Sequence, residues 1–141
     1  MKNPLRWLIP VILIISCSTT TYEFVVESYP DGNPKTVRHY KDEDHKVLLR
    51  EVQYYNDGGI YIEGTFKDGE RNGTWKAWHR NGNLWSQGEY KNGKENGLKT
   101  VYYENGNKYY EGELRDDNRV GKWTFWNEEG QKIKSIDYDQ P

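Results

Sequence analysis

Short runs of alternating apolar and polar residues fill the chain from Tyr29 onward, and each run stops at a glycine-rich turn. Leu84–Lys91 reads LWSQGEYK and Leu98–Tyr103 reads LKTVYY, with NGKENG between them and ENGN afterwards. Asn-Gly pairs supply the positive φ angles that tight hairpin turns need, so we expect them at hairpin tips. Strand-length runs bounded by such turns about every dozen residues predict an antiparallel β-meander.

A repeat of 24 residues, which is the step from Gly58 to Gly82, organises these runs. The first unit begins near Tyr29 and is slightly longer than the period, because Gly32 lies farther from Gly58 than Gly58 does from Gly82. The last unit stops at Tyr138. Five columns keep the period: Gly58, Gly82, Gly106 and Gly130; Gly64, Gly88 and Gly112; Gly73, Gly97 and Gly121; Trp78, Tyr102 and Trp126; Phe66, Tyr90, Leu114 and Tyr138. A fixed period with atypical end units predicts a stack of repeats over residues 29–141.

The parity of each strand predicts which face forms the core. Gly64, Gly88 and Gly112 share a face with most of the aliphatic residues, and that face is the better candidate for the interior. A glycine inside a strand marks a close approach by something bulky, so we expect tryptophans of neighbouring strands over these glycines. The expected occupants are Trp75, Trp78, Trp123 and Trp126. Because Trp75 and Trp78 differ in parity, we also expect a bulge or a strand end between them.

Composition explains how so polar a chain can fold. Only 34% of the residues are hydrophobic, but 12 Tyr, 6 Trp and 3 Phe can each bury a large area. The net charge is -2, with both signs interspersed. The chain therefore lacks the basic patch that a nucleic-acid partner requires.

The N-terminus predicts export and lipidation. Lys2 and Arg6 precede an apolar run that is too short to span a bilayer, as in a secretory signal. Ile14-Ile15-Ser16-Cys17 resembles a bacterial lipobox, which implies cleavage after residue 16 and a lipid on Cys17, the single cysteine. The alternative is an ordinary cleavage site beside an incidental cysteine. We expect a signal peptide over 1–16, a polar tether over 17–28 and a lipid-anchored envelope protein, in the outer membrane if the cell has one.

The repeats resemble those of one known family. Glu63–Trp85 reads EGTFKDGERNGTWKAWHRNGNLW, which is similar to the MORN repeat, and more closely to its bacterial variant. Lys99 departs from the pattern in the column of Trp75 and Trp123, and Asp117 departs in the column of Gly69 and Gly93. The resemblance implies an all-β fold of stacked hairpins in one elongated, curled antiparallel sheet. Bacterial relatives are often labelled YwqK-type antitoxins, while eukaryotic ones resemble scaffolds.

The sequence offers little for catalysis or metal binding. His39, His45 and His79 have no metal-ligand spacing, and we expect no metal and no cofactor. The acidic clusters at residues 42–44 and 116–117 fall in turns, where solvated carboxylates are the more common outcome than a weak Ca²⁺ site. No glycine-rich phosphate loop or nucleophile elbow is present, so we expect no enzymatic activity.

Aromatic residues provide the candidate binding surface. Trp85 and Tyr109 occupy one repeat column on the face expected to be outward, with Ile133 next in line and Tyr61 nearby. Such a ladder could dock a protein partner or stack on sugar rings, although Tyr and Trp also favour strands for structural reasons alone. The sequence thus predicts an envelope lipoprotein whose repeat module binds or scaffolds a protein. The alternatives are an antitoxin or immunity protein, and glycan or cell-wall binding.

Overall fold

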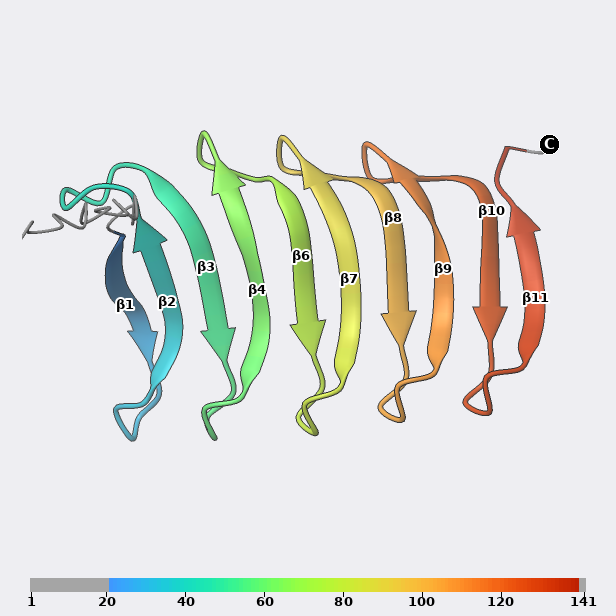
Figure 1. The fold of residues 1–141 in the computed structure, drawn as a ribbon, viewed down its shortest axis with the longest axis horizontal. Coiled ribbons are helices and arrows are strands. Elements are labelled where there is room, and N and C mark those ends of the chain that lie inside the picture. Colours follow the sequence, from blue (N-terminus) through green and yellow to red (C-terminus); the bar gives the residue numbers. More distant parts are fainter. Residues whose placement is uncertain (1–20, 140–141) are drawn as a thin grey trace, which may run out of the picture.

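The fold is a single antiparallel β-sheet (Figure 1). A computed structural model describes residues 21–139, so the expected signal segment, the lipobox and Cys17 lie outside the described residues. The strands are β1 Tyr22–Ser28, β2 Pro34–Tyr40, β3 Leu48–Tyr54, β4 Ile60–Lys67, β5 Glu70–Arg71, β6 Gly73–Trp78, β7 Leu84–Lys91, β8 Lys94–Tyr102, β9 Lys108–Arg115, β10 Asn118–Trp126 and β11 Lys132–Asp137.

Neighbours in the sheet are neighbours in the sequence. The order is β1-β2-β3-β4-β6-β7-β8-β9-β10-β11, and the two-residue β5 pairs with β4. Every pair is antiparallel, which confirms the predicted meander of stacked hairpins. The stretch 22–28, which we expected to be tether, forms β1 instead, because YEFVVES is rich in aromatic and β-branched residues and pairs along β2 from Tyr22–Tyr40 to Ser28–Pro34.

Two of the mid-strand glycines lie directly under tryptophan rings. The Trp75 ring covers Gly64, and the Trp123 ring covers Gly112, so closely that a β-carbon on either glycine would overlap the ring. Both tryptophans are buried. Since neither glycine has a positive φ, the requirement is for space and not for backbone freedom. The expected pairing of strand glycines with tryptophans is confirmed at these positions.

Each of these tryptophans sits in a small, self-contained core, as the surroundings of Trp75 illustrate. Phe66 meets the Trp75 ring edge-on at 5.4 Å between centroids, and Tyr90 lies 5.9 Å away. The Arg71 guanidinium covers the outer face at 3.9 Å from the centroid. The Trp75 indole N–H donates to the carbonyl of Thr65 at 3.1 Å. A single-layer sheet has no second layer to bury its side chains, so long side chains lying flat take that role.

In the middle repeat, an ion pair takes the place of the tryptophan that covers the mid-strand glycine. Lys99 replaces tryptophan, and its side chain covers Gly88, where an added β-carbon would lie 3.2 Å from Lys99 Cδ. Its ammonium pairs with Glu95, which also accepts a hydrogen bond from the Tyr90 hydroxyl. Glu95 holds the position in this repeat that Arg71 holds in the one before. The cation–tryptophan pair of one unit therefore becomes a carboxylate–lysine pair in the next, with the charge of the capping residue reversed.

Trp78 and Trp126, which we also expected over mid-strand glycines, do not cover them. Trp78 and Trp126 end β6 and β10, and both are only half-buried. The pairing register shifts between Ala77 and Trp78. We expected such an irregularity because Trp75 and Trp78 differ in strand parity. Trp75 supplies the atoms nearest to Gly64, while Trp78 lines a pocket with Tyr55 and its carbonyl accepts from the Tyr55 hydroxyl. The assignment of Trp78 and Trp126 to the glycine gaps was wrong.

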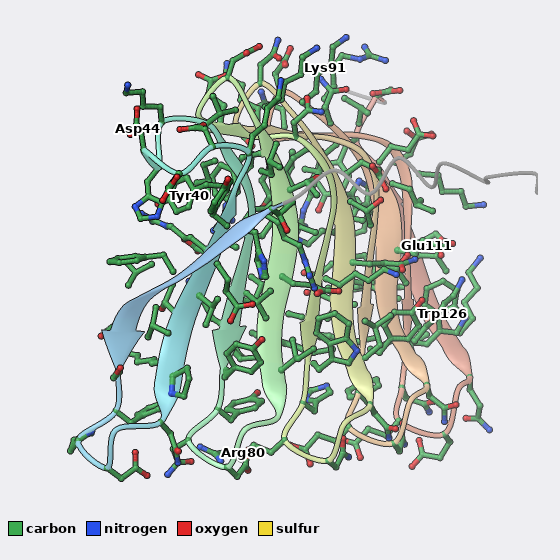
Figure 2. The ribbon with its side chains drawn as sticks, turned by 60° about the vertical axis from the view of Figure 1, so that its left-hand side comes forward. Tyr40, Asp44, Arg80, Lys91, Glu111 and Trp126 are labelled. Atoms are coloured by element: carbon green, nitrogen blue, oxygen red, sulfur yellow. The ribbon has the colours of Figure 1, made fainter. Side chains whose placement is uncertain are left out.

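Burial also extends to the face that we expected to be outward. Val52 is 1% exposed and pairs in register with Glu63, on the face opposite Gly64. Thr100, also 1% exposed, lies in the same row and donates to Glu111 at 3.2 Å. Figure 2 shows side chains on both sides of the sheet, with Glu111 pointing away from the ribbon. The glycine face holds the tryptophan cores, while the opposite face buries small side chains beneath ion pairs.

Apart from the longer connection over residues 41–47, two kinds of turn close the hairpins at opposite ends of the strands. One kind is a tight two-residue turn with positive φ at both positions, as at Asn92-Gly93 and at Asp116-Asp117. Asp117 thus holds the glycine position at φ 69°, and its carboxylate accepts from the amide of Glu95 at 2.7 Å. Not every Asn-Gly pair is a tip, however. Asn96-Gly97 lies inside β8, and the positive φ of Gly97 there accompanies a register shift in the pairing with β7.

Candidate functional site

Five-residue turns form a continuous edge along the other end of the sheet, at the bottom of Figure 1. In each, the first amide donates to the fifth carbonyl, and the amide of the glycine in fourth place donates to the first carbonyl. These glycines form the 58, 82, 106 and 130 column, preceded by Gly32, and all have φ between 79° and 89°. An Asp or Asn in third place accepts from the fifth amide in the first four turns. The sequence therefore dictates this edge locally.

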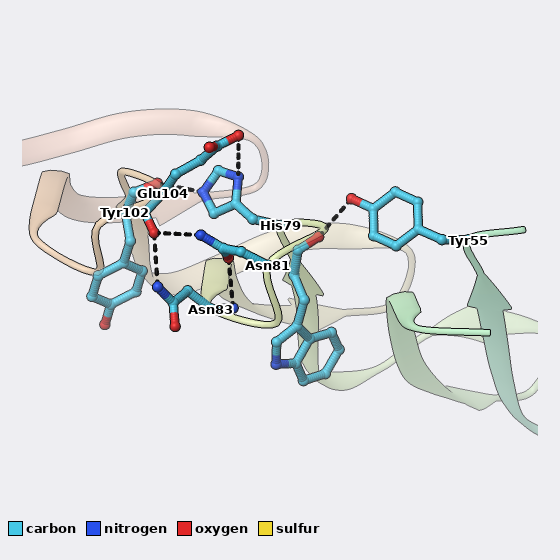
Figure 3. A network of polar contacts seen from close by, with 7 residues as sticks. Tyr55, His79, Asn81, Asn83, Tyr102 and Glu104 are labelled. Carbon is cyan, nitrogen blue, oxygen red and sulfur yellow. Dashed lines mark hydrogen bonds and ion pairs between the residues drawn. The ribbon is translucent and has the colours of Figure 1, made fainter. Parts of the chain in front are cut away.

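Adjacent turns are joined by asparagine side chains (Figure 3). Asn81 and Asn83 both donate to the carbonyl of Glu104, at 2.8 and 2.7 Å. One repeat later, Asn105 and Asn107 donate in the same way to the carbonyl of Glu128, each at 2.7 Å. Because these bonds recur at the repeat period, they fix the spacing of successive turns.

In the three inner turns, the first residue reaches to the next hairpin. The Tyr55 hydroxyl donates to the carbonyl of Trp78 at 2.8 Å, and Tyr103 does the same to Trp126 at 3.0 Å. Between them, His79 Nε2 lies 3.1 Å from the carbonyl of Tyr102. These contacts join successive repeats through rigid rings, so the side chains near the edge are held in place before any ligand arrives.

Tyr61, Trp85 and Tyr109, which we call the aromatic row, lie on one face just above this edge. The Tyr61 and Trp85 rings stack at 6.3 Å with an interplanar angle of 25°. Trp85 is 40% exposed and Tyr109 is 42% exposed, whereas Tyr61 is half-buried. Ile133, next in the column, is 57% exposed on the last strand. The structure thus brings the sequence-predicted residues to one surface and leaves two large aromatic rings open to solvent.

A cleft of about 450 Å³ separates Trp85 from Tyr109. Its other lining residues come from the turn edge and the end of β8: His79, Val101, Tyr102, Tyr103, Glu104, Asn105 and Glu128. His79 packs 5.9 Å from Trp85, and Tyr103 packs 4.8 Å from Tyr109. The volume lies within the range of small-ligand pockets, and it would hold one large side chain with room to spare.

The turn residues of this cleft were absent from the sequence-based prediction. Glu104 and Glu128 occupy the second place of their turns, a column that also contains Arg80 and has no fixed residue type. His79 and Tyr103 stand in the first place, where the aromatic character does recur. A search of that column for recurring rings would have found His79 and Tyr103 but not the two glutamates.

The acidic clusters at residues 42–44 and 116–117 have structural roles in the turns. Asp42 accepts backbone hydrogen bonds from Lys46 and Val47, each at 2.9 Å, and these bonds lower the pKa of its carboxyl. The carboxylates of Asp116 and Asp117 accept from Asn96 and from the Glu95 amide. Within residues 21–139, no three His, Cys, Asp or Glu side chains gather closely enough to hold a metal ion. That part of the chain also has no helix long and apolar enough to cross a membrane.

The comparisons with curated proteins and with a solved structure add little. No curated protein matches the chain. Among solved structures, it is similar to a mutant of S. aureus TarM in complex with fondaparinux, alpha-GlcNAc-glycerol and UDP, at 12% identity and a TM-score of 0.36. That match covers 71% of this chain and 21% of the other, a likeness too slight to carry an argument about fold or activity.

The family comparison is more specific. The family described as MORN repeat variant matches twice, over residues 71–92 and 95–116. The two matches begin at equivalent positions of adjacent repeats, and they run from β5 to β7 and from β8 to β9. The second match includes Lys99, so the ion-paired unit keeps the family pattern despite its missing tryptophan. Residues 71–92 and 95–116 therefore match MORN repeats of the variant type, within one open sheet of β-hairpins.

Proposed function

We propose that this protein is a non-enzymatic binding module, tethered to a bacterial envelope membrane by a lipid on Cys17, that binds a protein partner through the aromatic row. One observation carries the binding part: Trp85 and Tyr109 remain open to solvent beside a cleft whose walls are already fixed by hydrogen bonds. Exposed, rigid aromatic rings are the typical anchors of protein interfaces. The repeat family supports a module for binding or scaffolding.

Crosslinking in native envelopes tests this binding surface. The full chain carries an aromatic photo-crosslinking residue in place of Tyr102, which lines the cleft. We expect one dominant protein adduct, reduced at least about tenfold by Trp85→Ala or Tyr109→Ala, because loss of a central aromatic anchor costs about 2 kcal/mol or more. Phe24→Ala is the matched control, since Phe24 is also an exposed aromatic residue, 47% accessible, but lies on β1 outside the row.

Different outcomes separate the alternatives. Adduct yields that are unchanged in both row variants would refute the proposed surface. A toxin encoded beside this protein as the crosslinked partner would narrow the function to an antitoxin or immunity role. Polysaccharide pull-down that depends on Trp85, with no protein adduct, would replace protein binding by glycan binding.

Lipid anchoring has its own test. Cys17→Ala should abolish incorporation of a labelled fatty acid and release the chain from membranes, because the acyl chains supply about 0.8 kcal/mol of membrane affinity per buried methylene. Fractionation of inner and outer membranes then locates the wild-type chain. Continued fatty-acid labelling of Cys17→Ala would rule out this anchor without touching the proposed binding surface.

A further inference from the structure

The cleft between Trp85 and Tyr109 joins aromatic walls to an acidic rim. Glu104 and Glu128 line it from two successive turns, and the Glu104 side chain is 79% exposed. Its lining, taken entirely from the described residues, includes no lysine or arginine. Aromatic faces beside carboxylates attract cations, because the ring quadrupole and the carboxylate charge act in the same direction.

The preceding repeat shows what such a position holds when a cation is present. The Arg80 guanidinium lies over the Tyr55 ring, 4.6 Å from its centroid. The same guanidinium donates to Asn56 and pairs with Asp57, each at 3.2 Å. Figure 2 shows Arg80 at the turn edge of the sheet. The chain thus supplies its own cation to the ring of Tyr55 on this edge.

The following repeats keep the ring and reverse the charge. Tyr103 is the counterpart of Tyr55 and makes the same hydroxyl bond to the next hairpin. In the next two repeats, the counterparts of Arg80 are Glu104 and Glu128. Partial desolvation, followed by the charges of Tyr109 and Glu128, raises the pKa of the Tyr103 phenol.

We propose that this cleft receives an arginine or lysine side chain from a basic segment of the partner protein. The inference rests on the proposed function and specifies the partner's chemistry. The incoming cation would lie between the Trp85 and Tyr109 rings, with Glu104 and Glu128 as its counter-charges. It would thereby reproduce between two molecules the arrangement that Arg80, Tyr55 and Asp57 make within this one.

Peptide binding tests the charge requirement. Two immobilised peptides are compared: one alternates glycine and arginine, and the other carries citrulline in place of arginine. Binding of the full chain, in neutral detergent, is measured by biolayer interferometry. Citrulline keeps the length and planar shape of arginine but has no charge, and a carbonyl acceptor replaces one of its N–H donor groups. We expect at least about fivefold weaker binding of the citrulline peptide, since a partly desolvated cation–π contact is worth about 1–2 kcal/mol. Equal binding of the two peptides would overturn the inference.

Charge-neutral variants locate the effect. Glu104→Gln and Glu128→Gln should each weaken binding of the arginine peptide severalfold and reduce its salt dependence, because each removes one counter-charge. Glu129→Gln is the matched control, since Glu129 is the turn neighbour of Glu128 but does not line the cleft. An equal effect of all three variants would show general attraction only and would refute a built site.

The crosslinking experiment keeps the two proposals separable. If the native adduct depends on Trp85 but is unchanged by Glu104→Gln, by Glu128→Gln and by salt, the protein-binding function stands and the cationic specificity fails. If the adduct does not depend on Trp85, the proposed surface itself fails.

Discussion

Different side chains cover the mid-strand glycines, so adding one methyl group should destabilise the protein by different amounts at different glycines. At Gly112, a β-carbon would lie 2.2 Å from Cδ2 of Trp123, and at Gly88 it would lie 3.2 Å from Cδ of Lys99. Trp123 is 2% exposed, so its ring has little room to move, whereas Lys99 ends in a flexible chain that can shift. Gly112→Ala should therefore destabilise the protein strongly, and Gly88→Ala should not.

The magnitude follows from the contacts that a displaced Trp123 gives up. Its indole N–H donates to the carbonyl of Glu113 at 3.1 Å, a bond worth about 1 kcal/mol. The Arg119 guanidinium covers the ring at 4.4 Å, which adds about 0.5–1 kcal/mol. Overpacking strain contributes about 1–3 kcal/mol, and reduced freedom of the unfolded chain returns about 0.4–1 kcal/mol. The net loss at Gly112 is about 3 kcal/mol, against about zero at Gly88.

Equilibrium urea unfolding, followed by tryptophan fluorescence and circular dichroism, measures both variants beside the wild type. We expect a lower midpoint for Gly112→Ala at an unchanged slope, and a Gly88→Ala curve close to that of the wild type. Equal losses in the two variants would refute the reasoning, because they would show that the identity of the covering side chain does not matter.

Three further predictions concern the repeat contacts. Glu95→Arg should destabilise the protein, because it places two cations together. Adding Lys99→Trp should recover about 1–2 kcal/mol of unfolding free energy by restoring the arginine–tryptophan pair. If the double variant loses the sum of the two single losses in chemical denaturation, this prediction is wrong. Burial raises the pKa of the Tyr110 phenol above its ordinary value of 10.0, so the folded state holds this proton more tightly. That stability is complete below pH 10 and is lost as the pH rises through the folded pKa, so Tyr110→Phe should flatten the alkaline decline in unfolding free energy. Asn105→Ala should cost about 1–2 kcal/mol, measured by thermal unfolding, because it removes one bond within its turn and one to the next turn.

The repeats made the architecture predictable from sequence, because the same turn and strand residues recur in successive units. The columns led by Gly58 and Gly64 indicated turns and close approaches, and both roles are observed. Parity separated Trp75 from Trp78 and required the irregularity that the register shift provides. The aromatic row followed from the same parity, because side chains alternate strictly along a strand between bulges.

Other features depend on contacts between units, which no local pattern records. Parity could not place Trp78 once the register had shifted, because a bulge moves the following residue relative to its neighbours. The sequence also suggested one core face, yet Val52 is buried on the other, where the Arg50–Glu63 ion pair lies in the adjoining positions. The cleft combines turn residues from three repeats, so its lining emerged only when the turns were stacked.

By itself, the sequence determined that this protein is a stack of regularly repeated β-hairpins, because glycine φ angles, Asn-Gly turns and strand alternation are consequences of local chemistry. Tertiary structure decided which ring covers which glycine, how an ion pair replaces a tryptophan in the middle unit, and where an acidic aromatic cleft opens. Those outcomes depend on register and on the distance between adjacent repeats, which are set by hydrogen bonds between units such as those from Asn81 and Asn83 to Glu104.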